Sequence, residues 1–500
     1  MKKNLAASYA AQIYVALLNI LVVPVLMKLV GTEAYGLIGF FAMVQGWLLL
    51  MDAGMSPSLG RAASQYKSGG SSAAELKSLV RFSSRIFFLL AIGFLIVSIP
   101  AAPWIASNWL SVKNLSIGSV EFSIVVMLFA VAIRWRSQPY RSIITGLEEQ
   151  VWLNAFNAVL VTFRTFGSVA VALICGPNLF IFFSYQLAIA AIEAIGMYRK
   201  VAKLLPRKKS DSVSRVNPSD VRFFLKMSAT LMVTTATWTL LTQLDRLVLS
   251  KVISLSDFGV FSMAVLCASG IMALSGPLTG VLGPRLTIML ERKDFEGFLK
   301  VYRASMRFSI SIVFNGALTI ALFSDHLMMI WCADSNVAIK ASPIFFWYVI
   351  GNGFQALTAI FYNLQYAFGN LRLHLIGGCL LASTVVPSVI VAALKYGAVG
   401  TGVIWCAQAA LYFFIWGWIV HSRFLKTYRW DWLFRDALPL SLPTLAIGCL
   451  LKELPIPWGH GQVNDLIYLA LCVITCMVTS LVCNRDISSR ALTWVGCKNT

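Results

Sequence analysis

One arginine inside a long apolar run is the residue best placed to do chemistry. Arg164 lies near the middle of the run 151–175, which carries no other charged residue. On membrane-insertion scales a charge at a helix centre costs about 2.5–3.5 kcal/mol, so Arg164 should face protein or water. Asn154, Asn157 and Ser168 recur at helical spacing and continue one polar stripe. We interpret the stripe as an anion site in an aqueous cavity; the alternative is an Arg164–carboxylate pair that joins two helices.

Other charged residues at the ends of apolar runs are further candidates for substrate binding. Asp245 and Arg246 follow a run with threonines on one face, and they would face Arg164 across the cavity or bind a cation. The alternative is a pair at the outer membrane surface. Lys28 follows Pro24, a kink-forming residue, so periodicity leaves two directions open for Lys28, toward a cavity or toward the outer surface.

A group of arginines surrounds Pro139 at the inner end of another run. Arg134, Arg136 and Arg141 at a cytoplasmic mouth would attract phosphates or lipid headgroups. The alternative is that they set the topology of the helix by their positive charge. We include Arg134 among the candidate substrate-binding residues.

A repeated pattern supplies the candidates for coupling or gating. Lys28 precedes Tyr35-Gly36 at the same spacing as Lys251 precedes Phe258-Gly259. The apolar spans that follow end at Arg61 and Arg285, which would gate the inner mouth or simply anchor it. The echo predicts two related halves. Asp52, near the inner end of the first of these spans, is the matching candidate for ion coupling.

Composition places these residues in a membrane protein. Of 500 residues, 58% are apolar and 12% charged, and the mean hydropathy is +0.76, which excludes a soluble globular protein. Only helices can cross lipid in runs of this length. The sequence therefore predicts an all-α polytopic fold with about fourteen transmembrane helices, at residues 5–29, 36–55, 84–105, 121–142, 151–175, 178–198, 224–248, 257–283, 305–324, 342–367, 373–394, 398–420, 437–454 and 464–483.

The basic residues indicate both topology and domain organisation. Most of the 41 Lys and Arg residues fall in the segments on one side of the predicted spans, which predicts cytoplasmic N- and C-termini. Because the net charge of +20 sits in short loops, a nucleic-acid partner is not expected. The longest polar stretch predicts the division into a six-helix lobe (1–198), a basic cytoplasmic linker (199–223), a second six-helix lobe (224–420) and a final helix pair with the tail (421–500).

The sequence lacks the residues that several kinds of chemistry require. There is no Gly-x-x-x-x-Gly-Lys-Ser/Thr loop for ATP, and the ten cysteines and four histidines show no metal-ligand spacing. The outer loops are too short to hold a catalytic domain. We therefore expect a transporter without a cofactor or metal rather than an enzyme, with a proton or sodium gradient as the candidate source of energy.

Two stretches resemble a known family. Gly31-Thr-Glu-Ala-Tyr-Gly-Leu-Ile-Gly-Phe-Phe41 with Trp47-Leu-Leu-Leu-Met-Asp-Ala-Gly54, and Gln243-Leu-Asp-Arg-Leu-Val-Leu-Ser250 with Asp257-Phe-Gly-Val-Phe-Ser-Met-Ala264, are similar to bacterial O-antigen polysaccharide flippases (Wzx type) of the multidrug/oligosaccharidyl-lipid/polysaccharide exporter superfamily. The resemblance implies a MATE-like bundle of two six-helix lobes plus two helices. It also implies alternating access at the bacterial inner membrane, with an oligosaccharide on undecaprenyl diphosphate as substrate. Membrane lipids and other polysaccharide-assembly proteins are the implied partners.

Two other functions compete with this interpretation. A drug/cation antiporter would need a carboxylate-rich cavity, whereas this chain places an arginine in mid-membrane. A membrane polysaccharide polymerase or ligase would need catalytic residues in a substantial outer loop, which the sequence lacks.

Overall fold

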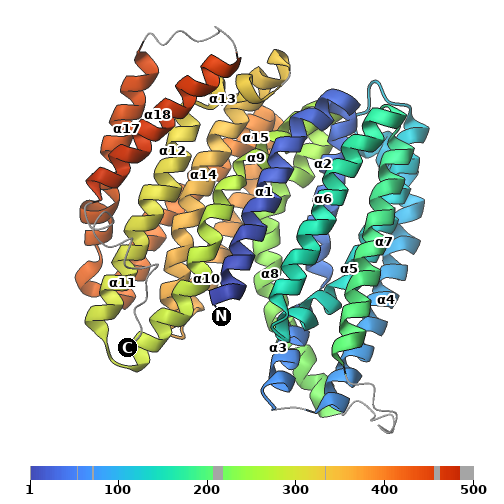
Figure 1. Cartoon of the computed structure of the whole chain (residues 1–500), viewed down its shortest axis with the longest axis horizontal. Helices are drawn as coiled ribbons and strands as arrows, with labels where there is room; N and C mark the ends of the chain where they lie inside the picture. Colours follow the sequence, from blue (N-terminus) through green and yellow to red (C-terminus); the bar gives the residue numbers. More distant parts are fainter. Residues whose placement is uncertain are drawn as a thin grey trace. The chain divides into compact units, whose positions relative to one another are not determined.

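Long apolar helices make up almost the whole of the described chain, as its apolar runs predict. The computed structural model describes residues 2–52, 55–69, 72–205, 218–332, 334–454 and 462–484 (Figure 1). Among these residues, 11 helical stretches are long and apolar enough to cross a membrane. Each of the roughly fourteen predicted spans falls on helical structure. The chain is a multi-pass membrane protein built of helices, which confirms the predicted class.

The chain divides into two compact units, Met1–Gly259 and Val260–Thr500. The division groups helix α8 (Pro218–Val252) with the first unit, whereas the predicted lobe boundaries place it in the second. Residues 206–217 of the predicted linker and 485–500 of the tail lie outside the described residues. The predicted boundaries at 198, 223 and 420 stay a prediction.

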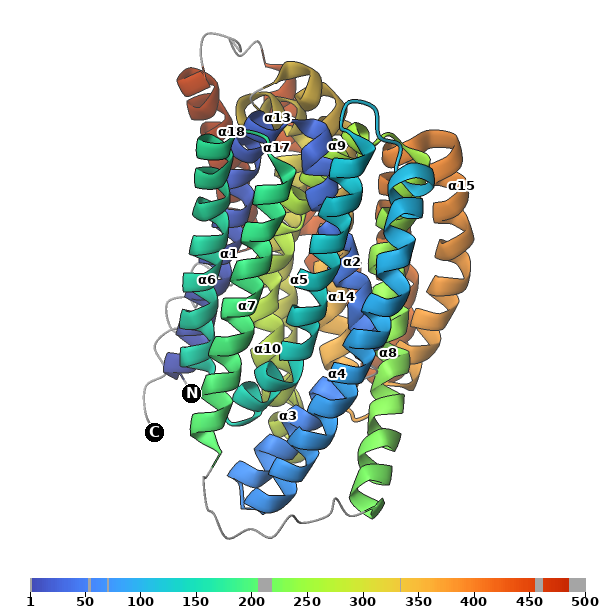
Figure 2. The same cartoon turned by 90° about the vertical axis from the view of Figure 1, so that its right-hand side faces the viewer.

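Helix α5 is the centre of the first unit. It packs against α3, α4 and α7, and Figure 2 shows it between α7 and α4, while α1 packs against α6. The helices of this unit and the π-helical segment η1 have these bounds: α1 Lys2–Val30, α2 Thr32–Met51, α3 Met55–Lys67, α4 Ala73–Trp104, η1 Ile105–Trp109, α5 Ile117–Gly146, α6 Gln150–Cys175, α7 Leu179–Leu204, α8 Pro218–Val252, and the first residues of α9 Leu255–Ala268.

Polar caps fix where three of these helices begin. The Ser72 side chain accepts a hydrogen bond from the N–H of Glu75, and the Glu75 carboxylate accepts one from the N–H of Ser72, so α4 starts with a capping box. Ser116 caps α5 and Asn178 caps α7 in the simpler way, each through one side-chain oxygen. These side chains satisfy backbone N–H groups that have no partner within the first turn of a helix.

The two copies of the repeated pattern lie against each other in the first unit. Gly36 of α2 leaves no room for a Cβ, because one would meet the carbonyl oxygen of Leu255, and a Cβ on Gly259 would meet the carbonyl oxygen of Thr32. The Thr32 and Ser256 hydroxyls are 2.7 Å apart and hydrogen-bonded. We call these two helix starts, 32–36 and 255–259, the paired turns. Their glycines allow the two backbones to approach closely.

A third segment closes over the paired turns. The Glu33 carboxylate accepts hydrogen bonds from the backbone N–H groups of Lys113 and Asn114, and the N–H of Leu255 donates to the carbonyl of Ser111 at 3.1 Å. The repeated pattern therefore marks a place where three segments of this unit, distant in the sequence, pack closely together.

Helix α14 is the centre of the second unit, where it packs against α10, α12, α13 and α15. One long helical element, α15, is broken at Gly397 (φ 59°), as the two predicted spans 373–394 and 398–420 require. The elements of this unit after α9 are α10 Gly270–Glu291, α11 Phe295–Phe308, η2 Ser309–Phe314, α12 Asn315–Leu322, α13 Ser324–Trp331, α14 Ser335–Ala367, α15 Arg372–Leu411, η3 Tyr412–Trp416, α16 Gly417–Phe424, η4 Lys426–Tyr428, η5 Trp432–Ala437, α17 Leu438–Glu453 and α18 Gln462–Cys483.

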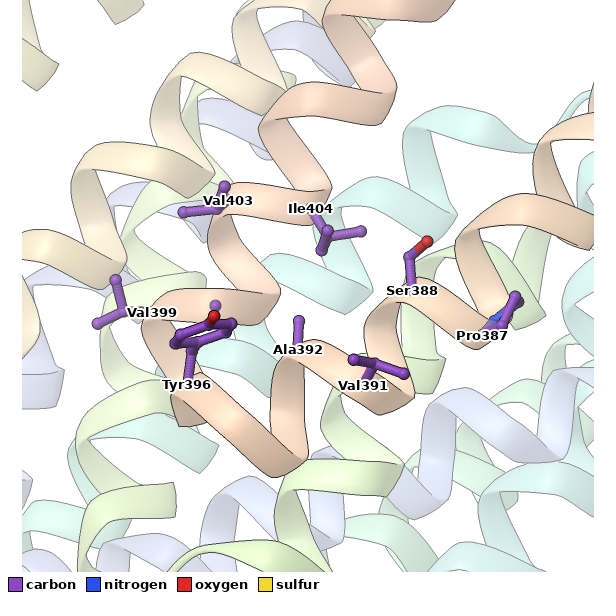
Figure 3. A pocket seen from close by; sticks show the side chains of 9 residues that line it. Pro387, Ser388, Val391, Ala392, Tyr396, Val399, Val403 and Ile404 are labelled. Atoms are coloured by element: carbon purple, nitrogen blue, oxygen red, sulfur yellow. The ribbon is translucent and has the colours of Figure 1, made fainter.

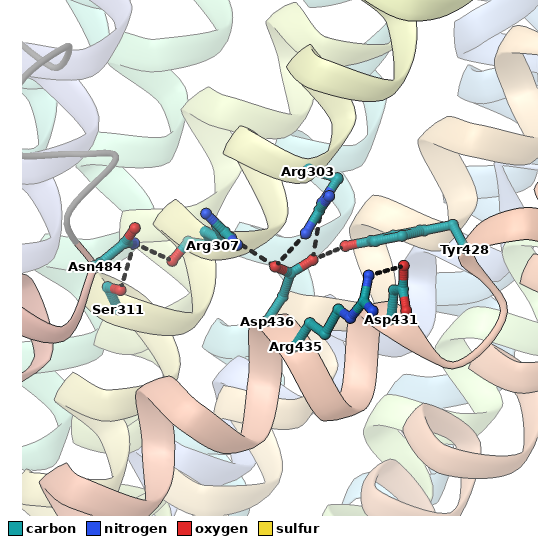
Figure 4. A network of polar contacts seen from close by, with 8 residues as sticks. All are labelled: Arg303, Arg307, Ser311, Tyr428, Asp431, Arg435, Asp436 and Asn484. Atoms are coloured by element: carbon teal, nitrogen blue, oxygen red, sulfur yellow. Dashed lines mark hydrogen bonds and ion pairs between the residues drawn. The ribbon is translucent and has the colours of Figure 1, made fainter.

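A buried carboxylate ties the beginning of the final helix pair to α11 (Figure 4). Asp436, with no exposed surface, accepts hydrogen bonds from Arg303 at 3.1 and 3.3 Å and from Arg307 at 2.6 Å. The Tyr428 hydroxyl donates to the same carboxylate. Burial, and then the charge of Asp436, raise the pKa of Tyr428 far above its ordinary range, so this hydroxyl stays a donor.

A second set of buried polar contacts joins η2 and α12 to the final helix pair, α17 and α18. The Asn315 amide donates to the carbonyl of Leu440 at 2.9 Å and to the Ser480 hydroxyl at 2.7 Å. The Asn484 amide donates to the Ser311 hydroxyl at 2.9 Å. Hydrogen bonds between helices specify packing where apolar contact alone discriminates little. Helices α17 and α18 are therefore firmly docked on the second unit.

Candidate functional site

The polar stripe of α6 faces the protein, as its spacing predicts. Ser168 is buried and accepts a hydrogen bond from Gln186 of α7 at 2.7 Å. On the other side of α6, Val159, Phe163 and Phe166 are each more than half exposed, the pattern of a lipid-facing surface. Arg164 therefore points toward α7.

Three arginines converge on one carboxylate from α7. Glu193 is 7% exposed, and its Oε2 lies 3.1 Å from Arg164 Nη2 and 3.7 Å from Arg134 Nε. Its Oε1 lies 3.5 Å from Arg141 Nη2. We call Arg134, Arg141, Arg164 and Glu193 the arginine cluster; its arginines come from α5 and α6.

The arginine cluster carries two more positive charges than negative ones. Within the part of the chain that the structure describes, Arg134 Nε and Nη2 and Arg164 Nε are buried without a hydrogen-bond partner. The Arg134 guanidinium also lies over the ring of Phe41, 5.5 Å from its centroid. Guanidinium donors in this arrangement suit a multivalent oxyanion such as phosphate.

The cluster combines both interpretations of Arg164. Arg164 pairs with a carboxylate of the next helix, as the structural alternative states, yet the pair is part of a site with excess positive charge. Asn157 lies next to the cluster, because its side-chain oxygen accepts a long hydrogen bond from Arg141, at 3.4 Å. A substrate-binding role for Arg164, Arg134 and Asn157 stays a prediction that this geometry supports.

The other predicted binding residues lie on other helices. Asp245 is buried and Arg246 half-buried on α8, which packs against α2 and α3, while the arginine cluster is built on α5, α6 and α7. Lys28 is exposed near the end of α1. The structure does not group these three residues with the cluster, and their binding role stays a prediction.

The predicted coupling and gating residues are also placed separately. Asp52 is buried between α2 and α3 and accepts a hydrogen bond from the Ser56 hydroxyl at 2.6 Å, with longer ones from its backbone N–H at 3.3 Å. Such contacts are those of a residue that caps the start of a helix. Arg61 on α3 and Arg285 on α10 are exposed. Their coupling or gating roles stay predictions.

Sequence reasoning missed Glu193. A signal was present, because Glu193 is the one acidic residue in the apolar run 178–198, and an ionisable residue inside a membrane span is by itself a candidate functional residue. Arg141 was recognised only as part of the group around Pro139. The structure instead separates that group, since Arg136 is exposed and lies over the ring of Phe88.

A crevice in the second unit is lined by apolar rather than charged side chains (Figure 3). It has a volume of about 650 Å³ and lies between the two arms of α15, on either side of the break at Gly397. Its lining is apolar except for the side chains of Ser388 and Tyr396. Such a surface suits lipid chains and cannot neutralise an anion.

Comparison with known proteins agrees with the fold. The family model described as "Polysaccharide biosynthesis protein" matches residues 1–290. A sequence search of curated proteins finds no significant match.

Three similar solved structures illustrate the fold. The lipid II flippase MurJ in an inward closed conformation is 14% identical with a TM-score of 0.72, over 97% of this chain and all of that one. An inward-facing multidrug resistance MATE family transporter of the MOP superfamily is 13% identical with a TM-score of 0.64, over 83% and 96%. A MOP superfamily transporter from Pyrococcus furiosus, described as having a binding pocket of reverse polarity, is 14% identical with a TM-score of 0.53, over 85% and 96%. These similarities confirm the predicted MATE-like fold.

Proposed function

Because the chain belongs to the family of polysaccharide biosynthesis proteins, we propose that it moves an oligosaccharide linked to undecaprenyl diphosphate across the bacterial inner membrane. The unit would be carried from the cytoplasmic to the periplasmic leaflet by alternating access, for assembly of O-antigen or a related polysaccharide. Cytoplasmic N- and C-termini follow from the distribution of basic residues. No chemical bond is made or broken in this reaction.

The arginine cluster is the observation that carries the proposal. A diphosphate has a negative charge on each phosphate, and the cluster has an excess of two positive charges with unused donors. A cationic site would lower the free-energy barrier for the charged headgroup, while the isoprenoid chain stays in the lipid. The cluster does not account for sugar recognition or for energy coupling. A proton or sodium gradient is the candidate source of energy.

The polarity of the cluster argues against the competing transporter. A drug/cation antiporter would have to hold a cationic compound beside three guanidinium groups, which repel it. One solved relative of similar fold is itself described by the reverse polarity of its pocket. The fold therefore accommodates binding sites of different charge.

The proposal is tested in a bacterial strain that lacks this protein and is complemented with the wild type, Arg164→Ala or Arg136→Ala at matched membrane levels. Arg136 is the matched control, because it is an exposed arginine on α5 outside the cluster. Surface polysaccharide is measured on gels, and lipid-linked repeat units are labelled with a sugar-specific reagent that does not cross the membrane. We expect the deletion and Arg164→Ala to lose polymer and to keep repeat units on the cytoplasmic side, unlabelled in intact spheroplasts.

Two results would overturn parts of the proposal. Repeat units that accumulate in the deletion but are labelled in intact spheroplasts would mean that translocation is intact, and would favour a polymerase or ligase. Full polymer in the Arg164→Ala strain, equal to that of Arg136→Ala, would remove the arginine cluster from the transport pathway.

A further inference from the structure

We propose that Glu193 is a resident counter-ion whose place the substrate phosphates take, and that it thereby sets how tightly the arginine cluster holds its anion. This inference rests on the proposed function of the cluster. In this role Glu193 does not bind the substrate but competes with it for the arginines.

The three guanidinium groups of the cluster surround the Glu193 carboxylate, which is too small to accept hydrogen bonds from all of their donors. Arg164 is within hydrogen-bonding distance of Glu193, at 3.1 Å, but Arg134 and Arg141 remain at 3.7 and 3.5 Å. Distances beyond about 3.2 Å are longer than ordinary N–H···O hydrogen bonds. A carboxylate has two oxygens, whereas a diphosphate offers more oxygens and more negative charge to the same guanidinium groups.

Access to the cluster lies on the side of Arg141 and Arg164. Their side chains are 38% and 29% exposed, whereas those of Arg134 and Glu193 are 12% and 9% exposed. An anion would therefore meet the two accessible guanidinium groups first. It would reach Arg134 only by moving the Glu193 carboxylate aside.

A resident carboxylate solves two problems of a transport site. In the empty protein it partly neutralises guanidinium groups that would otherwise be buried without a counter-ion. In the loaded protein it competes for the same donors, so the anion is bound strongly enough to enter and weakly enough to leave. Removal of its charge should therefore strengthen binding and slow release.

The test measures the binding of inorganic pyrophosphate to the purified full-length protein in nanodiscs of zwitterionic lipid, by isothermal titration calorimetry. We expect Glu193→Gln to bind pyrophosphate at least about tenfold more tightly than the wild type, because a like charge at this distance is removed. Arg164→Ala should lose most of the binding. Glu149→Gln is the matched control, since Glu149 pairs with Lys200 of α7 at 2.8 Å, outside the cluster.

Transport in cells provides a second readout that a purely structural role would not give. We expect Glu193→Gln to produce less surface polysaccharide than the wild type at equal membrane level, although it binds pyrophosphate more tightly. Loss of both binding and polymer in a folded Glu193→Gln protein would mean that Glu193 only positions the arginines, which overturns the inference.

The remaining outcomes separate the inference from the function on which it rests. Wild-type binding that requires Arg164 but is unchanged in Glu193→Gln would leave the anion site and remove the counter-ion. No pyrophosphate binding by any variant, or its complete displacement by phosphatidylglycerol in the nanodiscs, would remove the diphosphate site itself. If Glu193→Gln does not fold, Glu193→Asp is used instead, because it withdraws the carboxylate from the arginines by one methylene group. Pyrophosphate binding by Glu193→Asp that is no tighter than in the wild type would refute the proposal.

Discussion

Replacement of Asp436 should strongly destabilise the second unit. This carboxylate is fully buried and receives hydrogen bonds from Arg303, Arg307 and Tyr428 (Figure 4). Removal of one partner from a buried ion pair costs about 3–5 kcal/mol, because the other charge is left without compensation. The arginine side chains are 31% and 23% exposed and would regain some hydration, which favours the lower part of that range.

We therefore expect Asp436→Ala to lower the free energy of unfolding by about 3 kcal/mol, including the unpaired Tyr428 hydroxyl. Asp436→Asn keeps one good acceptor oxygen and should lose about 2 kcal/mol. Arg435→Ala is the control on the same segment, because Arg435 is 71% exposed and pairs with Asp431 at 3.3 Å. A surface pair of this kind contributes about 0–1 kcal/mol.

The assay is reversible denaturation of the purified protein in mixed micelles, followed by tryptophan fluorescence, since Trp432 is buried beside the network. Arg307→Ala and its double mutant with Asp436→Ala complete a cycle, in which the double mutant should lose less than the sum of the single losses. The reasoning is refuted if Asp436→Ala is as stable as Arg435→Ala, or if the losses of Asp436 and Arg307 simply add.

Three further outcomes follow from the first unit. Gly36→Ala should reduce the amount of folded protein in the membrane, because its Cβ would meet a backbone carbonyl of the facing turn; unchanged yield and thermal stability would contradict the close packing. Cysteines at Thr32 and Ser256, in a cysteine-free background, should form a disulfide, and polysaccharide synthesis should stop on oxidation and resume on reduction if the paired turns separate during transport; normal synthesis with a complete cross-link would show that they stay together. The ammonium of Lys67 lowers the pKa of Glu148, so this pair stabilises the fold at neutral pH and its contribution is lost as pH falls through that lowered pKa. Glu148→Gln should therefore slightly lower thermal stability at pH 7 and have no effect at strongly acidic pH, with high salt reducing the difference, and it leaves the hydrogen bond from Lys67 to the Leu147 carbonyl in place.

Local sequence was sufficient to predict the helices. Each apolar run must satisfy its own backbone hydrogen bonds in lipid, so run length alone predicts helical spans. The stripe of Asn154, Asn157, Arg164 and Ser168 was equally readable, because it depends only on the periodicity of one helix. The paired turns were visible as a repeated pattern, although their contact was not.

Tertiary packing determines which residues form the arginine cluster. Arg134 and Arg164 are thirty positions apart in the sequence, and no periodicity states that α5, α6 and α7 bring them to the same carboxylate. The sequence indicated that each charge needs a partner or water, since a lone charge in lipid is costly. Which partner it finds depends on which helices are neighbours and at what height, and the packing of whole helix faces determines both. For that reason the sequence shows Glu193 only as an isolated acidic residue in an apolar run, and only the folded protein shows that it lies among three arginines.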